Sequence, residues 1–191
     1  MDDAHSPAVT DEILEDCLEA LHRIESQGGS AVIGDVVAFA RISPAVAQVA
    51  CRELRIQGLL GPQPDRLVLS EEGRKHAAAI LRRHRLSERL LTDVLGLPWD
   101  RVHDHAMRLE HSLTSEAETR LQSLLNDPET CPHGGPIPGA DSRLDSPRTR
   151  RLDTVPVGEQ VRIEQITEQA GTFLRYLASL GLLPQTEIAV E

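Results

Sequence analysis

Apolar residues recur at every third or fourth position near the start of the chain, which is the spacing of one face of an α-helix. The pattern begins after Thr10, a favourable N-cap residue, and stops at the glycine pair of residues 28–29. Its apolar positions are Leu14, Cys17, Leu18, Leu21 and Ile24. A second helix is predicted over residues 32–40. A third begins at Ser43 and Pro44, an N-cap residue and a proline at the first helical position.

The third helix is expected to end at Gly58, and two short apolar stretches then flank a turn. The turn is the segment Gly-Pro-Gln-Pro of residues 61–64, which separates residues 59–60 from residues 66–69. Two short helices joined by about three residues and followed by a β-wing are typical of a winged helix-turn-helix. The first part of the chain is therefore predicted to be a winged helix.

Three more helices are predicted downstream, over residues 71–96, 98–111 and 115–125. Ser70 and Thr114 are the expected N-cap residues of the first and the third, and acids follow each of them in the first turn. All three patterns are amphipathic. Amphipathic helices that follow a module of this kind usually form a dimer interface.

The last part of the chain changes character. Residues 127–151 contain five prolines, so regular structure is expected to lapse there. Residues 160–166 then alternate as a β-strand does, residues 173–180 have helical spacing, and residues 187–190 are typical of a second strand. A five-stranded barrel needs about 60 residues to close, so this segment is expected to be about half of a small barrel.

Charge and composition exclude several classes of protein. A formal net charge of −10 argues against a protein that coats nucleic acid by bulk attraction. Residues 1–40 carry nine acids against one arginine, whereas residues 41–66 carry four arginines against two acids. A local excess of basic residues in an acidic protein is typical of a small DNA-contacting surface, and it is equally typical of a solvent-exposed helix face. Two Phe, one Tyr and one Trp are too few for stacking on single-stranded nucleic acid.

The sequence also bears on cellular compartment. It has no apolar run of about 18 residues and no basic segment joined to an apolar one near its start, so neither a membrane span nor a signal peptide is predicted. The cytoplasm is the expected location. Cys17, Cys51 and Cys131 are widely spaced and form no CxxC pair, which favours reduced thiols over a disulfide framework.

Candidate metal ligands gather in the helix predicted to end at residue 111. On an α-helix, His103, Met107, Glu110 and His111 lie within roughly 100° of one another, so four donors share one face. That face could hold a metal ion. Taken one at a time, each of these residues is more simply explained as a surface pair or a core filler.

Two other helices offer acidic and histidine donors. His84 and Glu88 form an i,i+4 pair on the preceding helix, and Asp16 and Glu19 form an i,i+3 pair on the first helix. The combination favours a metal-binding protein more than any single residue does.

Taken in order, these motifs resemble the diphtheria toxin repressor family of iron- and manganese-dependent regulators, over about residues 10–190. The motifs that carry the resemblance are EDCLE at residues 15–19, SPAVAQ at 43–48, HRLSERLL at 84–91, the run from VHD to EH at 102–111, and CPHGGPIP at 131–138. The segment FLRYLASLGL at residues 173–182 is similar to the start of the family's SH3-like domain, which also occurs in ferrous-transport proteins.

The resemblance implies four domains or segments and a fold class. They are a winged-helix DNA-binding domain at residues 1–72, a helical dimerisation and metal-binding domain at 73–138, a linker at 139–152, and an SH3-like, ferrous-transport-type segment at 153–191 that is expected to be incomplete. The fold class is mainly α with small β elements.

The resemblance also implies a regulatory metal site, called here the switch site, formed by Asp16, Met107, Glu110 and His111. Asp16 matches the manganese-type members, whereas Met107 stands where iron-type members usually have cysteine and manganese-type members glutamate. Two carboxylates and an imidazole suit Mn²⁺ or Fe²⁺, and the thioether adds softness without charge. Glu19 stands where manganese-type members supply a ligand to a second metal ion. Iron against manganese therefore stays open.

A second position, the ancillary site, is implied for His84, Glu88 and His103, so two metal sites are expected in each chain. The family usually completes this site from the SH3-like domain, but the corresponding places hold Ala170 and Phe173, which cannot act as side-chain ligands. Glu168 or water would have to substitute. Cys131 and His133 offer only two zinc donors, too few for a closed site, so a packing role for their loop is favoured.

The expected function is metal-dependent repression through double-stranded operator DNA bound by a homodimer, with no small organic substrate. The expected groove-facing and phosphate-contacting residues are Ser43, Pro44, Ala45, Gln48, Arg52, Arg55 and Arg66. Metal would fix the separation of two recognition helices at about 34 Å. A metal-independent winged-helix regulator is the main alternative. A metallohydrolase is disfavoured because HExxH and GxSxG are absent.

Overall fold

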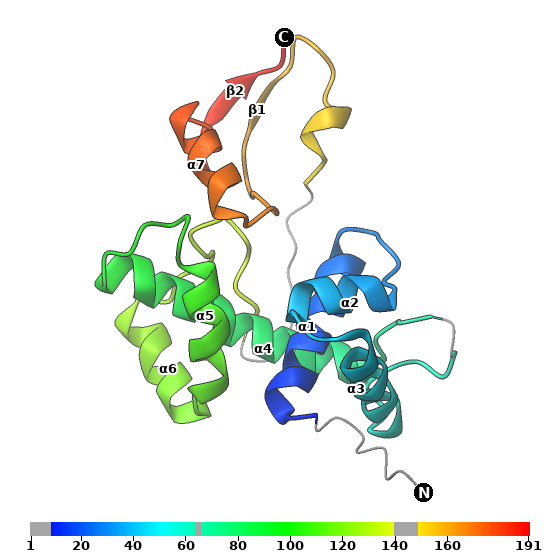
Figure 1. Ribbon diagram of the computed structural model, residues 1–191. Coiled ribbons are helices and arrows are strands. Elements are labelled where there is room, and N and C mark those ends of the chain that lie inside the picture. The colour runs from blue at the N-terminus through cyan, green and yellow to red at the C-terminus, as the bar shows by residue number, and fades with distance from the viewer. Residues whose placement is uncertain (1–8, 64–65, 140–148) are drawn as a thin grey trace, which may run out of the picture. The chain divides into compact units, whose positions relative to one another are not determined.

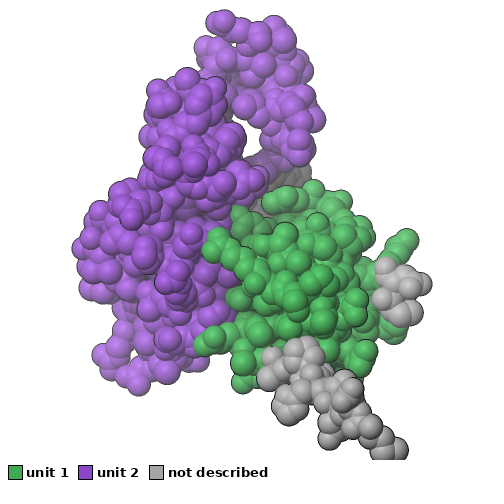
Figure 2. Space-filling view, viewed as in Figure 1, with its two compact units in different colours: residues 1–81 green, residues 82–191 purple. Residues whose placement is uncertain are grey.

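The protein is described from a computed structural model, which describes residues 9–63, 66–139 and 149–191. The chain divides into two compact units, residues 1–81 and residues 82–191 (Figure 2). Figure 1 labels the main helices and the two strands. Each unit is described by itself below.

The first unit contains the three helices expected from the hydrophobic spacing: α1 (Asp11–Ser26), α2 (Ile33–Ala40) and α3 (Pro44–Ile56). The side chain of Thr10 accepts a hydrogen bond from the backbone N–H of Ile13, and Ser43 caps α3 in the same way. At α2 the Asp35 carboxylate instead accepts from the backbone N–H of Val32. The helix predictions for this unit are therefore confirmed.

The wing is less regular than expected. Leu60 and Leu69 form an isolated antiparallel bridge, and Leu67 forms a second one with Ala31, so no continuous strands flank the turn in the residues that are described. Pro64, the last residue of the predicted turn, and Asp65 lie outside the described part. Glu25 stabilises this region from α1, because its carboxylate accepts from the backbone N–H of Leu69 at 2.7 Å.

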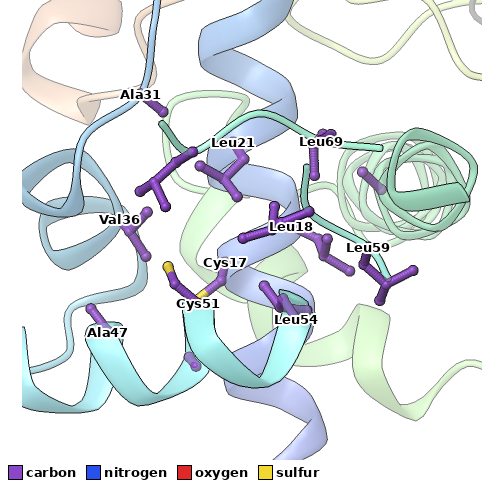
Figure 3. Packing of buried hydrophobic residues seen from close by; sticks show 14 of the residues in the cluster. Cys17, Leu18, Leu21, Ala31, Val36, Ala47, Cys51, Leu54, Leu59 and Leu69 are labelled. Atoms are coloured by element: carbon purple, nitrogen blue, oxygen red, sulfur yellow. The ribbon is translucent and has the colours of Figure 1, made fainter. Parts of the chain in front are cut away.

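The core of the first unit lies between α1, α3 and the wing (Figure 3). Cys17 and Leu21 of α1, Leu54 of α3 and Val36 of α2 have no exposed surface, and Leu69 of the wing is 2% exposed. Burial contributes about 1.5–3 kcal/mol for each large apolar side chain relative to exposure. This packing therefore fixes the position of α3 relative to α1 and the wing.

The buried cysteines lead to a first prediction. Burial raises the pKa of Cys17 to about 12, with smaller contributions from Cys51 and Asp16, and burial likewise raises the pKa of Cys131 to about 12. Since the thiolate is the nucleophile, we expect iodoacetamide to leave these thiols unmodified in the folded protein at neutral pH. Mass spectrometry with and without guanidinium measures this. Rapid labelling of folded Cys17 would contradict the assignment.

The second unit contains the next helices. The long helix α4 (Glu71–Arg89) starts in the first unit and ends in the second, and the π-helical turn η1 (Leu90–Val94) continues it. Then come α5 (His103–Leu109), the 3₁₀ turn η2 (Glu110–Ser112) and α6 (Ser115–Leu124). The hydroxyl of Thr114 caps α6 as expected.

One boundary prediction is wrong. The helix that carries His103 was expected to start at Pro98, but Pro98 to Arg101 form a turn closed by a 2.9 Å hydrogen bond between those two residues. The carbonyl of Trp99, which a helix would use internally, accepts from His133 instead. The α-helix also ends at Leu109, and Glu110 and His111 belong to a 3₁₀ turn. The four candidate donors therefore do not share one face of a continuous α-helix, as the sequence analysis had assumed.

The C-terminal part contains the expected strand, helix and strand. After the short 3₁₀ turn η3 (Leu152–Thr154), β1 (Gln160–Arg162) pairs antiparallel with β2 (Glu187–Ala189), with α7 (Gly171–Ser179) between them (Figure 1). The central pair of the register is Val161 with Ile188. Most of the predicted linker, residues 140–148, lies outside the described residues. The fold class, mainly α with small β elements, is confirmed.

In the parts of the chain that are described, no single helix has the length and apolar character needed to cross a membrane. The helices α2 and α3 meet those criteria only when taken together, and they are bent by 108° relative to each other.

Candidate metal centre

The three residues assigned to the ancillary site lie together in the second unit. His84 and Glu88 project from successive turns of α4, and His103 is the first residue of α5. The Nδ1 atom of His103 lies 3.1 Å from Nε2 of His84, which itself lies 3.2 Å from Oε1 of Glu88. One ligand atom from each lies within 4.8 Å of the others, a spacing that can hold a metal ion. The sequence-based grouping is thus reproduced in space.

Glu88 is the electrostatic centre of this group. Its side chain is completely buried, which by itself raises the pKa. The charge of His84 and hydrogen bonds from three histidines outweigh burial and hold the pKa of this carboxyl well below its usual range. Its Oε2 atom is buried without a hydrogen-bond partner among the described residues. An ionised, buried oxygen in that position fits a cation.

Sequence reasoning underestimated Cys131 and His133. His133 is buried, and its Nδ1 atom lies 3.2 Å from Oε1 of Glu88. Cys131, Glu88 and His133 therefore form a second three-donor group around the same carboxylate. The third donor is Glu88 of α4, more than 40 positions earlier in the chain. The spacing within CPHGG alone could therefore not reveal this group.

Arginines of α4 hold this loop in place. Arg89 donates from Nε to the carbonyl of Thr130 at 2.6 Å, and Arg85 donates to the carbonyl of Pro136. Arg82 donates to the carbonyl of Pro138 at 2.6 Å and pairs with Glu118 of α6. Since these arginines are three and four positions apart, they share one face of α4. The loop is packed as the sequence analysis favoured, and it also delivers donors.

The loop contacts the C-terminal segment as well. The carbonyl of His133 accepts from the backbone N–H of Ile166 at 2.9 Å. Gly134 has φ +84°, and a Cβ added to it would lie 1.9 Å from the carbonyl oxygen of Glu164. Only glycine fits this close approach. His133 therefore has two contacts: its ring lies beside Glu88, and its backbone carbonyl binds the C-terminal segment.

Three residues assigned to the switch site belong to the second unit, in α5 and in the turn η2 that follows it directly. Met107 is in the last turn of α5, and Glu110 and His111 form the start of η2. Glu110 is completely buried, its Oε1 lying 3.9 Å from Nε2 of His111 and its Oε2 lying 2.5 Å from Nδ1 of His84. His105, in the same helix, is exposed. Of the predicted set, Glu110 is therefore buried and Met107 and His111 are half-buried, in contrast to His105.

Asp16 and Glu19 belong to α1 in the first unit. Glu19 is 1% exposed, and its Oε2 atom is buried with no hydrogen-bond partner among the described residues. A carboxylate buried in this way is costly without a positive charge. That these two acids bind metal together with the donors of the second unit stays a prediction.

Comparison with known proteins decides the family. The family model described as "Iron dependent repressor, metal binding and dimerisation domain" matches residues 70–139, and the FeoA domain matches residues 150–191. The chain is 40% identical over 161 residues to the iron-dependent repressor IdeR of Mycobacterium bovis, covering 78% of this chain and 70% of that protein. It is 46% identical over 159 residues to the diphtheria toxin repressor of Corynebacterium efficiens, covering 77% and 68%.

The chain belongs to the diphtheria toxin repressor family.

Solved structures agree with this assignment. A manganese-dependent transcriptional repressor in complex with manganese is 31% identical, with a TM-score of 0.83, over 91% of this chain and 82% of that one. As a member of the diphtheria toxin repressor family, the protein is a metal-dependent transcriptional repressor that controls metal homeostasis, and it is not an enzyme.

The recognition helix of a diphtheria toxin repressor-type protein is expected at α3. Except for the half-buried Arg55, its predicted DNA-contacting residues are exposed, in contrast to the buried Ala47, Ala50 and Leu54 of its inner face. The exposed residues are Ser43, Pro44, Ala45, Gln48 and Arg52. The wing residue Arg66 is also exposed, and its carbonyl accepts from Arg55 at 3.4 Å. Arg55 thus supports the wing.

The chain departs from the diphtheria toxin repressor pattern at the C-terminal ligands. Ala170 precedes α7, and Phe173 is in its first turn and 42% exposed. The Oε1 atom of Glu168 accepts from the backbone N–H groups of Gln169 and Ala170, both at 2.9 Å. Glu168 therefore stabilises the start of α7 through Oε1, and its service as a substitute metal ligand stays a prediction.

Proposed function

We propose that this repressor binds operator DNA as a homodimer when Mn²⁺ or Fe²⁺ occupies two sites in each chain, and that it does so in the cytoplasm. The observation that carries the proposal is the buried donor group around His84, Glu88 and Glu110, in a chain that belongs to a family of metal-dependent repressors. In this proposal, residues 1–72 bind DNA, and residues 73–138 form the dimer and bind the metal. Residues 139–152 are a linker, and residues 153–191 are the FeoA-type segment.

The switch site would be formed by Met107, Glu110 and His111 together with Asp16 of α1. Carboxylate oxygen and imidazole nitrogen are donors that suit Mn²⁺ and Fe²⁺ alike. A bound ion would supply the positive charge that the buried Glu110 requires. Glu19 is a candidate ligand for a second ion near the same place, because it too is a buried carboxylate.

The ancillary site would be formed by His84, Glu88 and His103, with Cys131 and His133 as alternative donors to the same carboxylate. A divalent ion there would neutralise Glu88. The loop donors have a distinct chemical preference, since a thiolate with an imidazole and a carboxylate suits a softer ion such as Zn²⁺ or Cd²⁺. Because burial raises the pKa of Cys131 to about 12, binding through its sulfur would release a proton.

In DNA recognition, Pro44 would contact a thymine methyl group and Gln48 an adenine edge, while Arg52 and Arg66 would contact phosphates. Asp16 would connect the recognition domain to the donors of η2, so that metal binding narrows the range of separations between two recognition helices. Ligands shift such a population only by their differential affinity for the competent state.

Gln48 and Arg52 allow base readout to be separated from phosphate contact. We expect Gln48→Ala to cost about 1–3 kcal/mol on the preferred duplex and to relax the preference at one position of each half-site. Arg52→Ala should weaken all duplexes alike and reduce the salt dependence by about one phosphate contact per recognition helix. Fluorescence anisotropy over a salt series measures both, with Gln57→Ala as a control at the exposed end of α3. Identical behaviour of the two variants would refute these assignments.

The dimeric, DNA-binding part of the proposal is tested by selection. Duplexes from a randomised pool are selected with the full-length protein in the presence of Mn²⁺. We expect palindromes whose half-sites are about one helical turn, or a multiple of it, apart. Enrichment of single half-sites, or no enrichment, would count against a dimeric repressor.

The choice of metal is tested by titration under anaerobic conditions. Binding to the selected duplex is followed while Mn²⁺ or Fe²⁺ is added to metal-free protein, and the midpoints rank the two ions. Met107→Glu, which adds a carboxylate, should lower the midpoint for Mn²⁺ relative to Fe²⁺ because the harder ion gains more from oxygen ligands. An unchanged ratio of midpoints would show that Met107 does not set selectivity.

A further inference from the structure

We propose that Glu25 of α1 is a positioning residue for the wing. Its carboxylate gives Leu69 the hydrogen-bond partner that a neighbouring strand would otherwise supply, and it thereby holds Arg66 in place for DNA. The inference rests on the phosphate contact that the proposed function assigns to Arg66, and it adds the reason why the wing presents that arginine.

The second half of the wing has two edges with different partners. On one edge the wing pairs with itself. The carbonyl of Val68 accepts from the backbone N–H of Gly61 at 2.8 Å, and the backbone N–H of Ser70 donates to the carbonyl of Leu59 at 2.9 Å. Because neighbouring backbone groups of an extended chain point to opposite edges, the N–H of Leu69 points to the other edge.

That other edge has little backbone to pair with. Leu67 forms an isolated bridge with Ala31 there, and the chain before Ala31 turns at Gly28, which has φ +76°. At Leu69 the carboxylate of Glu25 is the partner, because its Oε1 atom accepts from the backbone N–H at 2.7 Å. Leu69 is only 2% exposed, and a buried N–H without an acceptor is costly. A side chain of α1 therefore completes this edge of the wing.

The second oxygen of Glu25 has a different partner. Its Oε2 atom accepts from Nε of Arg74, near the start of α4, at 3.0 Å. The side chain of Arg74 is 50% exposed and that of Glu25 is 18% exposed. An ion pair with so exposed a partner contributes little. The bond to Leu69, rather than the charge pair with Arg74, is therefore the interaction that positions the wing.

Arg66 is three positions before Leu69 and is exposed. Its carbonyl accepts from Nη2 of Arg55 of α3, at a longer distance of 3.4 Å. Side chains of two helices thus bind the second half of the wing, and Glu25 makes the shorter of the two bonds. If Leu69 loses this acceptor, the wing can move away from α1, and the guanidinium of Arg66 moves with it.

Two conservative variants separate the reach of the Glu25 side chain from its charge. Glu25→Asp keeps the charge but is one methylene shorter, so its carboxylate is withdrawn from Leu69. Glu25→Gln keeps the length and an acceptor oxygen but loses the charge. A positioning role predicts weaker DNA binding for Asp alone. A role of the charge alone predicts no change for Asp and tighter binding for Gln, because a negative charge near the phosphates is removed.

The experiment measures binding of the full-length protein to the selected duplex by fluorescence anisotropy over a salt series, at one fixed Mn²⁺ concentration. We expect Glu25→Asp to reduce the salt dependence by about one phosphate contact per wing, as Arg66→Ala does, and Glu25→Gln to keep it. The exposed Glu12 of α1, replaced by Asp and by Gln, is the matched control. An unchanged salt dependence of Glu25→Asp would overturn the inference.

Double variants test whether Glu25 acts through Arg66. Combined with Arg66→Ala, Glu25→Asp should cause no further loss, because the same contact is already absent. Combined with Gln48→Ala, its loss should be additive, because Gln48 belongs to the recognition helix and not to the wing. Additive losses with Arg66→Ala would contradict the proposed role.

Hydrogen exchange without DNA tests the structural step by itself. We expect the amide of Leu69 to exchange about tenfold faster in Glu25→Asp, as the loss of one part-buried hydrogen bond implies, while the amide of Leu54 in α3 keeps its protection. Unchanged protection of Leu69, or an equal loss at both amides, would contradict a role confined to the wing.

Failure of this inference is distinguishable from failure of the proposed function. If DNA binding does not depend on Mn²⁺, the metal switch fails, but the comparison of the Glu25 variants stands because it is made at one metal concentration. If Arg66→Ala leaves the salt dependence unchanged, the phosphate contact is misassigned. If Arg66→Ala reduces it and Glu25→Asp does not, only the positioning role of Glu25 is wrong.

Discussion

Replacing Glu110 by alanine is expected to abolish metal-dependent DNA binding and to leave the dimer intact. Glu110 is the buried carboxylate of η2, and it lies 2.5 Å from His84 and 3.9 Å from His111. Its loss removes a charged ligand from the switch site and the acceptor for the Nδ1 side of His84. Loss of a residue that only orients a ligand typically costs ten- to a hundredfold in metal affinity, so we expect the loss of a ligand to cost at least as much.

The measurement compares the affinity of Glu110→Ala and unmodified protein for the same duplex with and without Mn²⁺, with sedimentation to confirm the dimer. Asp104→Ala is the matched control, because Asp104 is an exposed acid in the helix that precedes Glu110. The control should keep its metal response. An unchanged metal response of Glu110→Ala would mean that the ligands are misassigned.

Gly134→Ala is expected to detach the C-terminal segment from the loop that contains His133. The added Cβ would lie 1.9 Å from the carbonyl oxygen of Glu164, and alanine is also strained at φ +84°. The backbone hydrogen bond from Ile166 to His133 cannot survive the required displacement. We expect the second unit to lose about 3 kcal/mol or more of stability, because both strain and lost packing contribute.

Gly158→Ala separates strain from the steric clash. Gly158 has φ +92° in the same unit, and an added Cβ meets nothing within 4 Å. It should cost only the roughly 1–3 kcal/mol of backbone strain. Thermal unfolding and hydrogen exchange at the Ile166 amide compare the two variants. Retained protection of Ile166 in Gly134→Ala would rule out the proposed docking role.

Local signals predicted most of the helices. Thr10, Ser43 and Thr114 act as N-caps as expected, because a hydroxyl that accepts from a backbone N–H a few residues later is a local interaction. The start of α5 could not be predicted in this way. The carbonyl of Trp99 is used by His133, and the carboxylate of Asp100 pairs with Arg175, so tertiary contacts override the helix-start signal of Pro98.

The candidate site was predictable where family motifs and helical spacing agree. His84, Glu88 and His103 were assigned from the sequence and lie together. The contribution of His133 was not foreseen, since it depends on how α4 and the following loop pack. The proposed partnership of Asp16 with Glu110 and His111 was assigned only from the family resemblance, because the arrangement of two units is not determined by local sequence patterns.

The most direct test of the account is the affinity of one selected duplex for the full-length protein, measured with saturating Mn²⁺ or Fe²⁺ and again with a chelator. We expect at least one of the two ions to tighten binding of the duplex by about a hundredfold, equivalent to about 2.7 kcal/mol of DNA-binding free energy. Equal affinity in chelator and in both metals would contradict it, and would favour a winged-helix regulator whose buried donors serve only the fold.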